Sequence, residues 1–167
     1  MGVSLDPYTT LGNPRRLLLS AYAVKHIVEE QGPLLANLKT IRKTPYSYTS
    51  KEPEATDAAS GSDVYVIEVR REGAQRTYWL GYKYQAKELF KPAGGGLWKD
   101  RFKYRNSAVP GDTAIGCYFE ALTQIVDVPF CDWLSSLKPG MARMPDHLTA
   151  SLEAIIADPA SGAKRFA

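Results

Sequence analysis

Cysteine and histidine are scarce in this chain of 167 residues, which contains only Cys117, Cys131, His26 and His147. Two cysteines separated by fourteen positions form neither a disulfide framework nor the CxxC pairs of a zinc site. A four-ligand metal centre would have to combine both cysteines with both histidines, or recruit carboxylates. We therefore expect two packed thiols, no metal centre and no cofactor.

Long apolar runs are also missing. The run that follows Arg15 and Arg16 ends after eight residues, which is short for an export signal and far below the ~20 residues that cross a bilayer. No small-residue cleavage site follows it. The sequence therefore predicts a cytoplasmic protein with no membrane partner, and it leaves the oligomeric state open.

The chain lacks the motifs that bind nucleotides through a glycine-rich loop. Gly94, Gly95 and Gly96 precede Lys99, but Asp100 follows that lysine where a phosphate-binding loop needs Ser or Thr. No GxGxxG motif follows a predicted strand, and no RNP, KH or helix-turn-helix signature is present. The three glycines indicate a hinge or a tight backbone passage instead.

A cluster of basic and aromatic side chains stands out from this background. With 44% hydrophobic residues, 23% charged residues and a net charge of +3, the whole chain has the composition of an ordinary globular protein. The window of residues 65–105 nevertheless holds nine of the 18 aromatic residues and ten of the 21 basic ones, against four acidic ones. Its net charge is +6, and the remainder sums to −3. Cations interleaved with flat rings are typical of surfaces that bind single-stranded nucleic acids.

Residues 64–84 within this window predict a β-hairpin. The two strands of this hairpin would place Arg70, Trp79 and Lys83 together on its solvent face. Pairing Arg71 with Arg76 aligns three apolar pairs on the other face: Val69 with Tyr78, Ile67 with Leu80, and Tyr65 with Tyr82.

We expect nine residues of the window to form one ligand-binding sheet surface. Three lie on the outer face of the hairpin, and six lie on a predicted strand at 97–105 in which basic and aromatic residues alternate. The cations would contact phosphates and the rings would stack on bases. The alternative is that the rings belong to the core and the cations only keep a sheet surface soluble. The nine are Arg70, Trp79, Lys83, Trp98, Lys99, Arg101, Lys103, Tyr104 and Arg105.

Capping residues and periodicity predict helices before the hairpin. Asn13 with Pro14 fits a helix start and Gly32 with Pro33 fits its end, so a helix is expected at 14–31 and a shorter one at 33–42. Residues 44–63 have few aliphatic side chains, which predicts a flexible loop or linker. We expect one domain spanning residues 1–167.

Further helices are expected after the hairpin. Residues 113–126 fit a helix capped by Asp112, with a pair of strands as the alternative. Pro129 and Pro145 each fit the first turn of a C-terminal helix. The predicted fold class is therefore α+β, with an N-terminal helix pair, a small antiparallel sheet built on the hairpin with at least one further strand, and C-terminal helices.

Three functions remain open on the sequence. The first is a non-enzymatic binding module whose basic, aromatic sheet surface engages an anionic partner, nucleic acid ahead of an acidic protein. The second is a protein-binding adaptor or inhibitor with tryptophan anchors. The third is a cysteine hydrolase, in which Cys117 at a helix start is the nucleophile, His147 its base, and Asp158 the group that orients the base.

Overall fold

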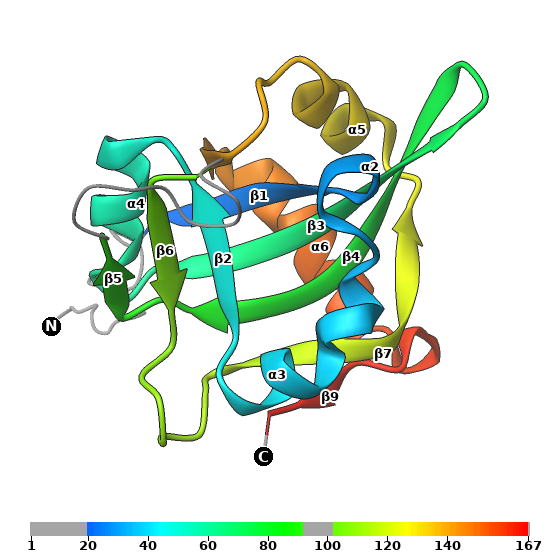
Figure 1. Cartoon of the computed structure of the whole chain (residues 1–167). Coiled ribbons are helices and arrows are strands. Elements are labelled where there is room, and N and C mark those ends of the chain that lie inside the picture. The colour runs from blue at the N-terminus through cyan, green and yellow to red at the C-terminus, as the bar shows by residue number, and fades with distance from the viewer. Residues whose placement is uncertain (1–19, 92–101, 167) are drawn as a thin grey trace, which may run out of the picture.

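A six-stranded mixed sheet forms the centre of the computed structural model, which describes residues 20–91 and 102–166 (Figure 1). From one edge to the other its strands are β8 (Met141–Met144), β1 (Ala21–Ile27), β3 (Asp63–Glu72), β4 (Gln75–Gln85), β7 (Gly116–Ile125) and β9 (Lys164–Arg165). β1 and β3 run parallel, and the other neighbours are antiparallel. A second, antiparallel sheet consists of β2 (Tyr46–Thr49), β6 (Tyr104–Ser107) and β5 (Glu88–Phe90), in that order.

Helices lie on both sides of the large sheet. They are α2 (Val28–Gln31), η1 (Leu34–Asn37), α3 (Leu38–Lys43), α4 (Glu52–Ala58), α5 (Val128–Ser135), α6 (Asp146–Ala157) and η2 (Pro159–Ser161). In Figure 1, α6 crosses behind the central strands, whereas α3 and the second sheet lie in front of them. Of the helices in the described ranges, none is long and apolar enough to cross a membrane.

The sheet has a core on each face because β3 is apolar on both. Tyr65 and Ile67 pack on the side of α5 and α6, and Val64 and Val66 pack on the side of α3 and the second sheet. All four side chains are at most 2% exposed. Burying an aliphatic side chain of this size contributes roughly 1.5–3 kcal/mol, so each face requires a covering layer.

The predicted helix at 14–31 is wrong over its described part. Most of that part forms β1, and only α2 is helical. Residues 14–19 lie outside the described residues. Tyr22 and Val24 point into one core and Ala23 into the other. A strand covered on both faces appears in the sequence as a continuous apolar run, which periodicity does not distinguish from a helix.

Residues 113–126 likewise contain a strand, β7, in place of the predicted helix. Tyr118 and Phe119 are buried on opposite faces of the sheet, as neighbours along a strand must be. The pairing of β4 with β7 is irregular between Leu80 and Tyr82, and such a bulge breaks the period of two. The apolar spacing along β7 therefore resembles that of a helix.

The remaining predicted elements divide into confirmed and corrected ones. The hairpin is β3 with β4, the helix at 33–42 corresponds to η1 and α3, and the two C-terminal helices are α5 and α6. Residues 44–63, where a loop was expected, contain β2 and α4, and both Ala55 and Ala58 in α4 are fully buried. The predicted fold class is wrong, because a six-stranded mixed sheet replaces the small antiparallel sheet and a strand replaces the first helix.

A bulge at Gly81 changes the register of the hairpin. The pairs at Val69 and Ile67 are as predicted, but Tyr65 pairs with Lys83 rather than with Tyr82. Gly81 leaves little room for a side chain, because a Cβ at this position would lie 2.5 Å from Leu34 Cδ1. The extra residue moves the side chains that follow it to the opposite faces of the sheet.

The backbone of β4 lies so close to Gly116 that it leaves no room for a side chain there. The φ of this glycine is +141°, and a Cβ at this position would lie 2.0 Å from the carbonyl oxygen of Lys83. We expect Gly116→Ala to lower the free energy of unfolding by roughly 2–6 kcal/mol, because backbone strain and overlap act together. Gly111→Ala is the control, since Gly111 has φ +90° with open space around it, and strain alone should cost about 1–3 kcal/mol. Urea unfolding followed by circular dichroism compares the two, and equal losses would contradict the overlap.

Candidate functional site

Two of the predicted ligand residues on the hairpin already bind each other. The Arg70 guanidinium lies 4.0 Å from the centre of the Trp79 ring, and its Nε donates to Glu68 at 2.5 Å. Glu68 is only 1% exposed and also accepts a hydrogen bond of 2.7 Å from the backbone nitrogen of Leu34. The Trp79 indole donates to Thr77 at 2.9 Å. Glu68 therefore attaches η1 to the sheet, and Arg70, packed on Trp79, is the ion-pair partner of this carboxylate.

Lys83 lies on the opposite face of the sheet from Arg70 and Trp79. Its ammonium donates to Glu153 of α6 at 2.6 Å and lies 5.3 Å from the centre of the Tyr65 ring. The bulge at Gly81 causes this inversion. The hairpin face predicted from the sequence is therefore divided between two sides of the sheet.

The other predicted ligand residues belong to the second sheet or lie outside the described residues. Trp98, Lys99 and Arg101 are in the latter group. Tyr104 is buried, and its hydroxyl donates to Glu52 at 2.7 Å. Two further cations lie beside it: Lys103, which is exposed, and Arg105, whose guanidinium lies 5.2 Å from the centre of the Phe90 ring. The described members of the two groups thus lie in or next to different sheets.

The three residues considered for a cysteine hydrolase are not joined by any hydrogen bond in the described part of the chain. Cys117 is buried in β7, not at a helix start, and burial raises the pKa of its thiol. His147 is exposed in the first turn of α6. The Asp158 carboxylate accepts a hydrogen bond from the backbone of Ala160 at 2.9 Å, which caps η2. Among the described residues, neither His147 nor Asp158 is therefore placed to act as a base on the thiol.

A group of cations that the sequence analysis did not single out lies on α3. Lys39, Arg42 and Lys43 are exposed, and their spacing of three and four residues places them on one side of the helix. They line an open hollow of about 700 Å³, together with Thr44 and the loop before β7. The Arg42 guanidinium lies 5.3 Å from the centre of the Tyr118 ring. We call these three residues the α3 cations.

The hollow beside α3 is positively charged. Asp112 is the carboxylate in its lining, against the three α3 cations. In the described ranges, no ion pair involves any of the three. Their i, i+3, i+4 spacing was visible in the sequence, with the buried Ile41 between them. The signal was overlooked because the charge count is higher in residues 65–105.

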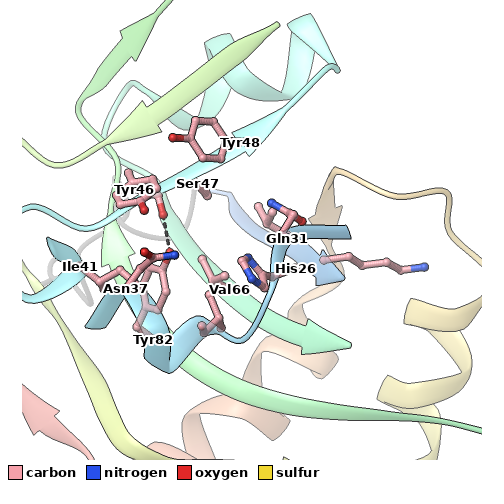
Figure 2. A pocket seen from close by; sticks show the side chains of 12 residues that line it. His26, Gln31, Asn37, Ile41, Tyr46, Ser47, Tyr48, Val66 and Tyr82 are labelled. Atoms are coloured by element: carbon pink, nitrogen blue, oxygen red, sulfur yellow. Dashed lines mark hydrogen bonds between the residues drawn. The ribbon is translucent and has the colours of Figure 1, made fainter. Parts of the chain in front are cut away.

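A second, narrower pocket lies on the other side of α3, between β1, β2 and η1 (Figure 2). His26 Nε2 donates to the carbonyl oxygen of Gly32 at 2.7 Å. Burial lowers the pKa of His26, so the imidazole is neutral near pH 7 and its Nδ1 is an acceptor. The Tyr82 hydroxyl donates to the carbonyl oxygen of Tyr46 at 2.5 Å across the pocket floor.

Neither the described residues nor the comparisons indicate an activity. Among the residues described, no group of three or more His, Cys, Asp or Glu side chains is arranged to hold a metal ion. No protein-family model matches the chain, and a search among curated proteins gave no match. The two hollows beside α3 are therefore the candidate sites.

The stability of the protein should depend on pH through His26. Its pKa is near 6.5 in an unfolded chain and lower in the folded protein because of burial. The unfolded state therefore binds more protons below about pH 6.5, so the free energy of unfolding should fall as the pH decreases from there towards the folded pKa. The His26→Gln variant should lose less stability than the wild type between about pH 7.5 and pH 5.5 in urea titrations. An unchanged pH dependence in the variant would contradict this.

Cys117 should be chemically inert in the folded protein. Burial both shields the thiol and raises its pKa, and only the thiolate reacts. In a Cys131→Ser background, we expect iodoacetamide at neutral pH to label Cys117 at least about tenfold more slowly in the native state than in urea. Native labelling as fast as in urea would restore the nucleophile hypothesis.

Proposed function

We propose that this protein is a non-enzymatic binding module for an anionic partner, nucleic acid ahead of an acidic protein, and that the α3 cations contact the phosphates. The observation that carries the proposal is that three exposed cations from one side of one helix surround a single open hollow without an ion-pair partner among the described residues. Arg70 and Lys83, by contrast, are both paired with carboxylates.

The α3 cations repel one another in the free protein. Lys39 and Lys43 are four residues apart on a helix, and like charges at this spacing cost about 0.2–0.5 kcal/mol. A bound phosphate would relieve the repulsion and release its own counterions to solution. The planar Arg42 guanidinium is also suited to two parallel hydrogen bonds with phosphate oxygens.

The shape of the hollow supports a polymer rather than an enclosed small anion. Its volume of about 700 Å³ is open to solvent, and exposed side chains form its rim. The Thr44 and Thr113 hydroxyls in the lining supply further hydrogen-bond donors. A phosphate backbone crossing this hollow would lose little hydration, as is usual in nucleic-acid interfaces. Both described cysteines are free, which suits a cytoplasmic location.

Replacing the three α3 cations with alanine should weaken nucleic-acid binding in a salt-dependent manner. Fluorescence anisotropy of labelled single-stranded and duplex oligonucleotides at several salt concentrations measures the slope of log Kobs against log salt. Each lost phosphate contact should reduce the magnitude of the slope by about 0.7–0.9, so the triple variant should reduce it by up to about 2–3.

The matched control replaces three other exposed cations, Lys87, Lys138 and Arg143, with alanine. Both variants change the net charge equally, so a specific contribution of α3 appears only as a larger loss in the first variant. Equal losses, or no binding of wild type at low salt, would overturn the proposal for nucleic acid. A polyglutamate peptide that binds more tightly than either oligonucleotide would assign the surface to an acidic protein instead.

A further inference from the structure

The narrow pocket beside α3 contains polar atoms that make no hydrogen bond to the described residues. Among the described residues, no hydrogen bond involves the Asn37 side chain, the Gln31 amide nitrogen or His26 Nδ1. All three side chains are half-buried and line the same pocket. Figure 2 shows His26 and Gln31 at one end, Asn37 and Tyr46 at the other, and Val66 between them. Such unpaired donors and acceptors are expected to hydrogen-bond with water or with a ligand.

The pocket lining carries a single charged side chain. It contains no carboxylate, and the one ammonium, that of Lys25, donates to the carbonyl oxygen of Leu137 at 2.6 Å. His26 is uncharged near pH 7 because burial lowers its pKa. A cationic ligand would lose its hydration without a carboxylate to pair with, and an anionic one would compete with the Leu137 carbonyl for the Lys25 ammonium, so the lining favours an uncharged ligand.

The walls of the pocket are apolar and partly aromatic. Val24 and Val66 on the large sheet form one wall, and Tyr46 and Tyr48 on β2 belong to the other. The Tyr46 and Tyr48 rings contact each other edge to face, with centroids 5.4 Å apart. Apolar and aromatic walls with donors and acceptors at the ends favour a ring that has both kinds of group on its edge.

We propose that this pocket binds an uncharged heteroaromatic ring with neighbouring hydrogen-bond donors and acceptors, the chemistry of a nucleobase. The Asn37 amide both donates and accepts, and so pairs with the edge of such a ring. Gln31 supplies a donor and His26 Nδ1 an acceptor at the opposite end. This site is distinct from the hollow of the α3 cations, and a ligand without phosphate tests it separately.

Side chains at the mouth must move for a ring to enter. The space between atoms is about 440 Å³ when the open solvent at the mouth is included, but the centre of a water molecule reaches only about 20 Å³ of it, which is room for about one water. The half-buried Gln31 side chain can rotate out of the lining once its Oε1 releases the hydrogen bond from the Ile27 backbone nitrogen. Rotations of this kind are common when ligands bind.

The test is an NMR titration of nitrogen-15-labelled protein with adenosine, guanosine, cytidine and uridine, each to about 5 mM, a range that covers weak binding. We expect at least one nucleoside to shift the side-chain amide signals of Asn37 and Gln31 in a saturable manner. A parallel titration with short single-stranded oligonucleotides identifies the source of the ring. Shifts with free nucleosides assign a small-molecule site, and shifts with strands alone assign a base-binding pocket for nucleic acid. Both outcomes support the inference.

Asn37→Leu should weaken the binding at least about tenfold, because the ring edge then loses its partner. Asn37→Asp keeps the shape of the side chain but removes both of its N–H donors, so it should also weaken nucleoside binding. This variant replaces Asn37→Leu in the test if the leucine variant folds poorly. Gln124→Leu, the loss of an exposed amide on β7, is the matched control and should bind as the wild type does. Alanine at all three α3 cations should leave nucleoside binding unchanged.

Two results would overturn the inference. One is the absence of any saturable shift at the Asn37 and Gln31 amides with every nucleoside and strand. The other is undiminished binding by folded Asn37→Leu and Asn37→Asp, since the ring would then lie elsewhere. Neither result bears on the salt dependence of oligonucleotide binding, so the proposed function is judged separately.

Discussion

Burial of β3 on both of its faces is the constraint on which the rest of the structure depends. Side chains from Val64 to Val69 are buried without interruption, and alternation along a strand sends half of them to each side of the sheet. Helices α5 and α6 cover one side, and α3 with the second sheet covers the other. Both candidate sites lie beside α3, within or next to this second layer, because a helix and a small sheet leave hollows where they meet a twisted sheet.

The segment that carries α3 is attached to the sheet by a buried charge. A six-residue helix is not stable alone in water, and its position depends on contacts before and within it. Glu68 accepts a hydrogen bond from the Leu34 backbone and pairs with Arg70, which in turn packs on Trp79. Arg70 and Trp79, which resemble a ligand-binding pair in the sequence, thereby have a structural role. The cations of α3 remain exposed because its apolar residue Ile41 faces the core.

The part of the fold that was predictable from the sequence is the part with local signals. The β3–β4 turn follows from Glu72–Gln75 turn chemistry and alternation, and α5 and α6 follow from a proline in or just before the first turn and from helical spacing. β1 and β7 were not predictable in this way. A strand buried on both faces and a strand with a bulge both lose the period of two. Of the candidate sites, the α3 cations had a local signal in their spacing, whereas the pocket residues His26, Asn37 and Tyr46 had none.

By itself the sequence determined the local excess of basic and aromatic residues, the scarcity of cysteine and histidine, and the elements set by turns and caps. Only the tertiary structure decided which of the cations are available to a partner. Gly81 inserts one residue into β4 and sends Lys83 to the face opposite Arg70, where each meets its own carboxylate. The physical reason is that an ion pair depends on distance in space, and a single bulge changes which side chains share a face without changing the composition.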